Sequence, residues 1–297
     1  MSSWRESAGR KEGNEGYRFG DLTRTLVKKL IVGGEEAVES KLPSRIARTV
    51  KRYGWRPDLP DHRDLKADFS HIFAALPKSV DLRDKCPDLY DQGELGSCTA
   101  NAIAAAFEFD QRKELIAEFK PSRLFIYYGE RKMEGSCDSD SGAMIRDGIK
   151  VVHKLGCCDE ALWPYDVDKF TEEPPAAAYA AAKAHKSVRY YRVAQCERML
   201  KGCLAAGFPF VFGFTVLSSF ETEEVAKTGL MPMPTDGDQQ LGGHAVCCVG
   251  YDDAKECFIV RNSWGNSWGD GGYFYMPYKY MTDSGLASDF WTIRWVE

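Results

Sequence analysis

The stretch Gln92-Gly93-Glu94-Leu95-Gly96-Ser97-Cys98-Thr99-Ala100-Asn101-Ala102 joins a glycine-bearing turn to an alanine-rich run, and a cysteine stands at the junction. Residues 102–109 are good helix formers, and their apolar side chains recur at helical spacing. This pattern predicts a buried helix that begins close to Cys98. Because unpaired N–H groups at a helix N-terminus stabilise a thiolate and lower the pKa of a cysteine, we expect Cys98 to be a nucleophile at neutral pH.

A cysteine nucleophile needs a group that moves its proton and a second group that orients that base. Two later stretches hold such groups: Gly242-Gly243-His244-Ala245-Val246, with a histidine 146 residues beyond Cys98, and Asn262-Ser263-Trp264-Gly265-Asn266-Ser267-Trp268-Gly269. With Gln92 six residues before Cys98, this order resembles the papain-like, cathepsin-type cysteine peptidases. The resemblance covers residues 77–275.

The resemblance implies a role for each of these residues. Cys98 would attack the peptide carbonyl, and His244 would hold the thiolate as an ion pair and later protonate the leaving amine. Asn262 would fix the orientation of the imidazole, and Trp264 would cover that hydrogen bond and keep water away from it. The side-chain amide of Gln92 and the backbone N–H of Cys98 would stabilise the oxyanion.

The resemblance also implies where a substrate would bind. Family members commonly select an apolar side chain two residues before the cut, in a pocket walled by both lobes. Gly242 and the stretch 285–290 are candidates for this pocket. Gly142 is the nearest match to the glycine that lines the cleft and pairs with the substrate backbone. The alternative is a glycine that merely allows the turn.

Two positions depart from the family pattern. The family usually has a cysteine three residues before the nucleophile and an aromatic residue directly after it, where this chain has Leu95 and Thr99. The first change removes a common disulfide and the second alters one wall of the cleft. No catalytic group is lost.

The first and second halves of the chain differ in pattern. Residues 140–154 show helical spacing, whereas four later stretches are short, β-branched or aromatic, and bounded by Gly, Asp or Asn: 208–214, 245–251, 257–261 and 272–276. The resemblance implies a papain-like two-lobed α+β fold. A helical lobe would surround the Cys98 helix, and a β-rich, barrel-like lobe would carry His244 and Asn262 across a cleft.

The N-terminal quarter differs from the rest in charge. Residues 1–75 carry 15 Lys and Arg against 11 Asp and Glu, a net charge of +4, whereas residues 76–297 carry 24 against 33, a net charge of −9. Leucines at 22, 26 and 30 predict a short helix, Pro43 opens another, and 55–64 reads as an extended connector.

These features suggest a division of the chain at residue 76. We expect residues 1–75 to be an inhibitory pro-segment, held by complementary charge, whose connector threads the cleft of a peptidase domain formed by residues 76–297. The chain would then be a zymogen. The alternative is a permanent extension packed away from the site.

Composition limits the partners and the compartment. The net charge of −5 argues against nucleic acid as a main partner. The first residues lack the apolar stretch of a secretory signal, and no run reaches membrane-spanning length, so we expect a chain that binds no membrane and is cytoplasmic or delivered by a non-classical route. Most of the ten cysteines are expected to be reduced.

The leading hypothesis is a thiol endopeptidase that hydrolyses polypeptides without a metal or organic cofactor. Zinc binding by His244, Cys247 and Cys248 is disfavoured, since paired zinc ligands usually stand two to four residues apart. One alternative is acyl or amide transfer by the same Cys-His-Asn set, with an amine in place of water. The other is a catalytically silent papain-like binding module, which usually lacks a catalytic residue that this chain retains.

Overall fold

The computed structural model describes residues 53–296, and the two helices predicted before residue 53 lie outside this range. Every described residue belongs to one compact unit. Among these residues no helix is both long enough and apolar enough to span a membrane.

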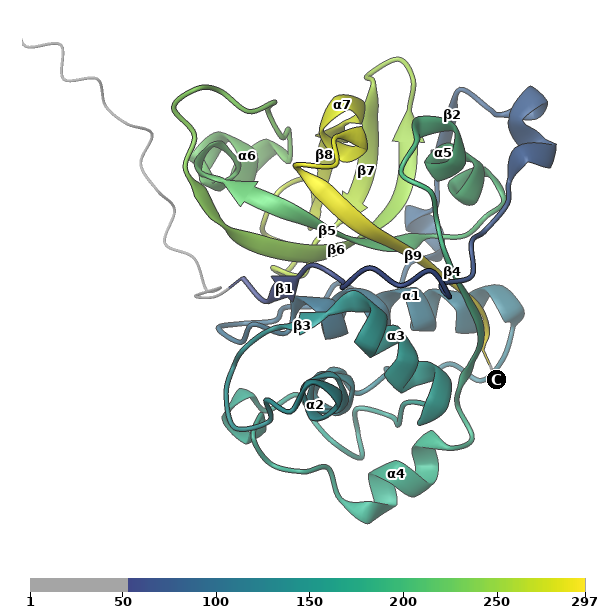
Figure 1. Cartoon of the computed structure of the whole chain (residues 1–297), viewed down its shortest axis with the longest axis vertical. Coiled ribbons are helices and arrows are strands. Elements are labelled where there is room, and N and C mark those ends of the chain that lie inside the picture. The colour runs from purple at the N-terminus through teal and green to yellow at the C-terminus, as the bar shows by residue number, and fades with distance from the viewer. Residues whose placement is uncertain (1–52, 297) are drawn as a thin grey trace, which may run out of the picture. The chain divides into compact units, whose positions relative to one another are not determined.

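Four helices form one half of this unit (Figure 1). They are α1 (Cys98–Glu114), α2 (Arg123–Glu134), α3 (Ile145–Lys154) and α4 (Ala176–Ala182). The first fourteen residues of α1, Cys98 to Gln111, are all buried. Small alanine side chains allow this helix to be surrounded closely by other elements.

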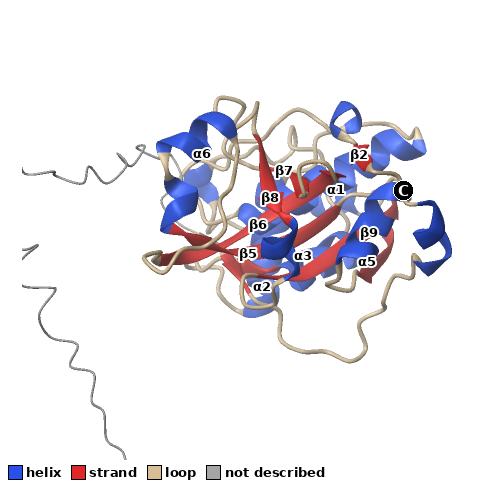
Figure 2. Ribbon diagram, turned by 90° about the horizontal axis from the view of Figure 1, so that it is seen from above, coloured by secondary structure: helices blue, strands red, loops and turns tan. Residues whose placement is uncertain are grey.

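A seven-stranded sheet forms the other half, with the strand order β4-β9-β5-β6-β7-β8 and β2 paired to β6. Seen from above, β9, β5 and β6 run side by side across the unit (Figure 2). The strands are β2 (Ser79–Asp81), β4 (Ser187–Arg192), β5 (Phe210–Leu217), β6 (Gln240–Asp252), β7 (Cys257–Arg261), β8 (Tyr273–Pro277) and β9 (Ala287–Val296). Shorter helices lie around it: α5 (Glu197–Ala205), α6 (Glu223–Thr228) and α7 (Tyr278–Thr282).

The two-lobed α+β architecture expected from the sequence is confirmed. The predicted helix at Cys98, the helix with spacing from Ile145, and all four predicted strands are present. The β-rich half is an open sheet and no closed barrel, because β4 and β8 at its two ends do not pair with each other in the described part of the chain. Strands β4 and β9 were not predicted, and together they form one edge of the sheet.

Residues 57–75 run along the body of the unit. The Ala67 N–H donates to Arg192 O at 2.9 Å, the Arg192 N–H donates to Leu65 O at 2.7 Å, and Phe69 is buried against Gly202 of α5. The resemblance to the papain-like peptidases begins only at residue 77, after this segment, but the segment itself packs on the body. The functional boundary at residue 75 therefore stays a prediction.

A cluster of charged side chains, Asp58, Asp64, Asp289, Arg146 and Arg192, anchors the start of this segment. Asp58 accepts hydrogen bonds from the Arg146 N–H at 3.0 Å and from Trp291 Nε1 at 2.8 Å, and its own N–H donates to Asp289 at 2.7 Å. Arg146 pairs with Asp64 at 2.6 Å, and Arg192 pairs with Asp289 at 2.7 Å. The anchor therefore joins α3 of the helical half to β9 of the sheet.

Asp110 is a buried carboxyl group on α1. Only 1% of it is exposed, and neither carboxyl oxygen has a hydrogen-bond partner among the described residues. Burial raises its pKa from the usual 3.8 to about 8, and nearby Lys113 and Arg294 offset only part of this rise. Asp110 is therefore protonated in the folded chain at neutral pH.

We predict that Asp110→Asn changes the pH dependence of stability. The folded chain keeps a proton that the unfolded chain loses above pH 3.8, so the contribution of Asp110 is complete below that pH and is lost as pH rises to about 8. Stability of the variant relative to the parent should rise by about 1.4 kcal/mol per pH unit within this window. Urea unfolding at several pH values measures it, with exposed Asp138→Asn as the control; parallel curves would contradict the assignment.

Candidate active site

Cys98 is the first residue of α1 and faces strand β6 of the sheet. Its Sγ accepts a hydrogen bond from the Ala245 N–H at 3.4 Å, and the residue is completely buried. Because Ala245 directly follows His244, this contact joins the helix start to the strand that carries the histidine. The predicted nucleophile and the predicted base therefore lie on opposite walls of the same site.

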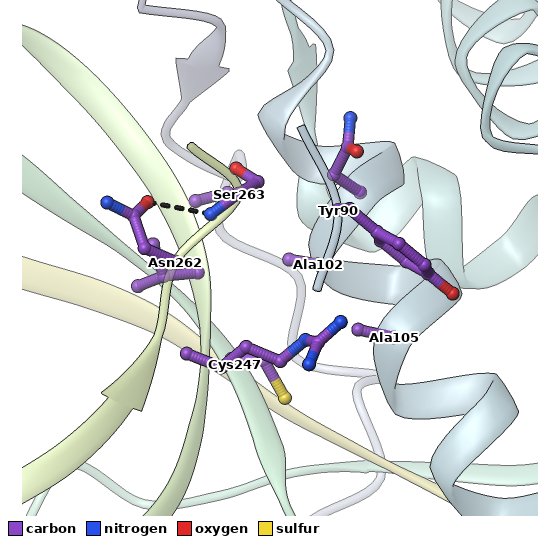
Figure 3. Close-up of a pocket in the computed structure, with 10 residues that line it drawn as sticks. Tyr90, Ala102, Ala105, Cys247, Asn262 and Ser263 are labelled. Atoms are coloured by element: carbon purple, nitrogen blue, oxygen red, sulfur yellow. Dashed lines mark hydrogen bonds between the residues drawn. The ribbon is translucent and has the colours of Figure 1, made fainter. Parts of the chain in front are cut away.

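His244 is oriented by Asn262. His244 Nε2 lies 2.8 Å from Asn262 Oδ1. The Ser263 N–H donates to the same oxygen at 2.8 Å, and Figure 3 shows this second bond. Since a backbone N–H can only donate, the Asn262 atom is the carbonyl oxygen and Nε2 of His244 must carry a hydrogen. That tautomer leaves Nδ1 as the nitrogen that can accept a proton.

Aromatic rings enclose the imidazole. Trp264 stacks on His244 with centroids 5.0 Å apart and an interplanar angle of 24°, and Trp268 meets Trp264 edge-on at 4.9 Å. Phe214 approaches the imidazole at 5.7 Å. These rings exclude water from the bond between His244 and Asn262, and a lower local dielectric strengthens that bond.

Gln92 is held rigidly on the turn before α1. Its Oε1 accepts a hydrogen bond from Ser263 Oγ at 2.6 Å, and its Nε2 donates one hydrogen to Leu95 O at 3.0 Å. Tyr165 OH also donates to Gln92 O at 2.9 Å. Nε2 carries a second hydrogen, which gives the amide a donor for a developing oxyanion.

A small cavity lies behind Asn262, between α1 and β6 (Figure 3). Its volume is about 10 Å³, which is room for a single water molecule at most. Cys247, one of its lining residues, and the adjacent Cys248 are both buried, and burial raises the pKa of both thiols. Both residues are part of the hydrophobic core. All ten cysteines are free thiols.

Residues 53–56 cover the site. Strand β1 (Trp55–Arg56) lies between the sheet and the helices in Figure 1 and pairs in parallel with β3 (Ala143–Met144). The Gly54 N–H donates to the Cys98 thiol, while Gly54 O accepts from the Ala143 N–H at 2.7 Å. The Cys98 sulfur therefore faces an N–H donor and not a carbonyl carbon that it could attack. Gly54 O accepts its hydrogen bond from β3 and not from the side chain of Gln92, the predicted oxyanion donor.

Glycines give room to the two aromatic side chains of this segment. A Cβ on Gly242 would lie 2.7 Å from Tyr53, whose ring centroid is 6.0 Å from that of His244 and whose hydroxyl donates to Glu221. A Cβ on Gly213 would lie 1.9 Å from the Trp55 indole. Any larger residue at these positions would displace the segment.

The covering segment reverses one expectation from the sequence. Burial raises the pKa of the Cys98 thiol to about 12, although the Ala245 and Gly54 N–H groups act to lower it. The expected lowering by the helix N-terminus is therefore wrong for the covered site. Removal of water from the thiol outweighs the hydrogen bonds that would stabilise a thiolate.

The structure brings Gln92, Cys98, His244, Asn262 and Trp264 into one site. The two glycines proposed to contact substrate lie against residues 53–54. Gly242 leaves room for Tyr53, and Gly142, with φ +69°, leaves room for Gly54 O. The backbone hydrogen bond to Gly54 O comes from the neighbouring Ala143 N–H.

Sequence reasoning missed Ala143 and Gly213. A glycine inside an otherwise bulky strand pattern marks a close approach, and that signal identifies Gly213.

Known proteins resemble this chain in sequence and in fold. The model of the papain family of cysteine proteases matches residues 76–292. An uncharacterized peptidase C1-like protein of Acanthamoeba polyphaga mimivirus is 53% identical over 69% of this chain and 68% of its own, and cathepsin B-like CP2 of Giardia intestinalis is 31% identical over 68% and 69%.

Solved structures share the fold. The crystal structure of xylellain, a cysteine protease from Xylella fastidiosa, is 47% identical with a TM-score of 0.77, covering 86% of this chain and 99% of that one. Procathepsin L 3 of Tenebrio molitor, at 17% identity and a TM-score of 0.64 over 85% and 83%, shows the fold alone. With the family match spanning most of its length, this chain belongs to the papain family of cysteine proteases.

Proposed function

We propose that the chain is an endopeptidase that uses Cys98, His244 and Asn262 as its catalytic triad. The observation that supports this most strongly is the hydrogen bond of His244 to Asn262 beneath Trp264, next to the contact between Ala245 and the Cys98 thiol. A substrate acyl group in place of Gly54 would meet a nucleophile, an oriented base and the Gln92 amide together.

Each group then has a defined role in the reaction. His244 Nδ1 takes the thiol proton, and the Cys98 sulfur forms a bond to the peptide carbonyl carbon. Gln92 and the Cys98 N–H donate to the resulting oxyanion. The C–N bond breaks as the imidazolium protonates the amine, and water activated by His244 then releases the acid from the thioester.

We further propose that the chain is made in an inhibited form in which residues 53–56 act as the inhibitor. Three observations support this. Gly54 contacts the Cys98 thiol, the side chains of Tyr53 and Trp55 fill space left by glycines, and the anchor at Asp58 holds the segment in place. Residues 1–52, which the sequence assigns to the same pro-segment, lie outside the described residues.

We predict that Trp55→Ala opens the site. Burial of a large apolar side chain stabilises by about 1.5–3 kcal/mol, so its loss should raise the alkylation rate of Cys98 in the full chain by at least tenfold. Iodoacetamide labelling with peptide mapping measures this rate, and the exposed thiol of Cys196 serves as an internal standard. Leu59 lies just after the covering residues and its side chain is 69% exposed, so Leu59→Ala is the matched control. Equal rates of Cys98 alkylation in the parent, Trp55→Ala and Leu59→Ala would contradict the inhibitor proposal.

With the Trp55→Ala chain as parent, we predict that Cys98→Ala abolishes peptide hydrolysis and that Gln92→Ala lowers kcat by about 10²–10³-fold, because one oxyanion donor is lost. Cys196→Ala removes an exposed thiol and should retain the parent activity. Product analysis with an added amine separates hydrolysis from acyl transfer. Activity of Cys98→Ala within tenfold of the parent would refute the mechanism.

A further inference from the structure

A buried carboxyl group lies close behind the nucleophile. Glu130 of α2 is completely buried, and its Oε2 accepts a hydrogen bond from Thr99 Oγ1 at 2.8 Å. Thr99 directly follows Cys98 in the first turn of α1, at the position where the family usually has an aromatic residue. This departure from the family pattern therefore links an acid to the residue next to the nucleophile.

The third helix of this half leaves room for the carboxyl group. A Cβ on Gly148 of α3 would lie 2.1 Å from Glu130 Oε1, so any larger residue there would displace the acid. Gly148 does not have a positive φ, so its backbone conformation does not itself require glycine. The three helices α1, α2 and α3 thus meet at Glu130, where α1 supplies a donor and α3 supplies space.

The surroundings of Glu130 disfavour a carboxylate. Its Oε1 is buried and has no hydrogen-bond partner among the described residues. The guanidinium of the neighbouring Arg131 donates to backbone oxygens, among them Cys137 O at 2.8 Å. Burial raises the pKa of Glu130 to about 8, the Thr99 hydroxyl and Arg131 lower it, and Asp147 of α3 raises it further. Glu130 is therefore protonated at neutral pH.

The charge of Glu130 acts on the nucleophile. Burial has the largest effect on the pKa of the Cys98 thiol, the Ala245 and Gly54 N–H groups lower that pKa, and a charge on Glu130 raises it. Like charges in a buried site repel each other, so a carboxylate at Glu130 disfavours the thiolate. Glu130 acts on the thiol from the helical half, whereas His244 faces it from the sheet.

We propose that Glu130 is a positioning residue of the active site: through Thr99 it fixes the first turn of α1, and in its protonated form it keeps negative charge away from the Cys98 thiolate. The proposal rests on the proposed peptidase function and adds a group that does not touch the substrate. When pH rises enough to ionise Glu130, the carboxylate disfavours the thiolate and turnover falls. Glu130 thus contributes to the loss of activity at alkaline pH, together with the imidazolium of His244.

The test compares Glu130→Gln with its parent, both in the Trp55→Ala chain, between about pH 6.5 and pH 9.5. Gln keeps the shape of the protonated acid and cannot ionise. The ratio of the two kcat/KM values cancels every titration that the two proteins share, so its pH dependence reports Glu130. We expect this ratio to be constant below pH 7 and to rise about threefold or more by pH 9.5, with a midpoint at about 8.

Asp110→Asn is the matched control. Asp110 is also a buried acid of α1, and burial raises its pKa to about 8, but it stands twelve residues beyond Cys98, which is about 18 Å along the helix. Its substitution should leave the kcat/KM ratio constant with pH. An equal step for Asp110→Asn would show that any buried acid of this half produces the effect, which would overturn the specific role of Glu130.

Two substitutions of Thr99 test the link to α1. Thr99→Ser keeps the hydroxyl and should retain the parent profile. Thr99→Val has a similar shape but loses the donor that lowers the pKa of Glu130, so its alkaline loss of kcat/KM should begin at higher pH. Identical profiles for Thr99→Ser and Thr99→Val would refute the link. If thermal unfolding shows that Glu130→Gln does not fold, this pair decides the proposal.

Alkylation separates the possible failures. Labelling of Cys98 by iodoacetamide in the full chain, with Trp55 in place, requires no hydrolysis and should show the same ratio, since the thiolate is the reacting form. A ratio that stays constant with pH in both assays would overturn the role of Glu130. Absence of hydrolysis together with a pH-dependent alkylation ratio would instead overturn the proposed function and support the action of Glu130 on Cys98.

Discussion

The contact between the Cys98 thiol and the Ala245 N–H is the constraint on which the site depends. It requires the start of α1 to reach the backbone of β6, and α1 can do so because alanines line much of the surface that it buries. A larger residue along this face would separate helix and strand. The thiol would then move away from His244, while the hydrogen bond of His244 to Asn262, made within the sheet, would remain.

Two opposing effects act on the Cys98 thiol, and their sizes decide its state. The helix N-terminus favours the thiolate by about 0.3–1 kcal/mol. Complete burial can raise a pKa by about 3–5 units, or about 4–7 kcal/mol, so burial dominates while Gly54 covers the sulfur. The buried acid Glu130, whose Oε2 accepts from Thr99 Oγ1 at 2.8 Å, has a pKa raised to about 8 for the same reason.

Local pattern and chain order identified most of the site but little of what covers it. The site residues Gln92, Cys98, His244 and Asn262 could be predicted from their spacing, because each stands beside a glycine turn, a helix start or a strand. The charged anchor at Asp58 could not be predicted from the sequence, because its partners Arg146 and Asp289 lie 88 and 231 residues away along the chain. Likewise, β4 and β9 carry mixed polar and apolar residues that match no simple alternation, and their pairing with distant strands defines them.

The position of the charged anchor determines how the covering residues behave as a tethered ligand. The anchor holds residue 58 onward, on the C-terminal side of Gly54, so removal of the chain before residue 53 would leave the tether intact. A short flexible tether gives an effective concentration on the order of millimolar. A peptide present at micromolar concentration would therefore occupy the cleft only if it bound far more tightly than the tethered residues do. The other route is cleavage of the chain between the anchor and Gly54.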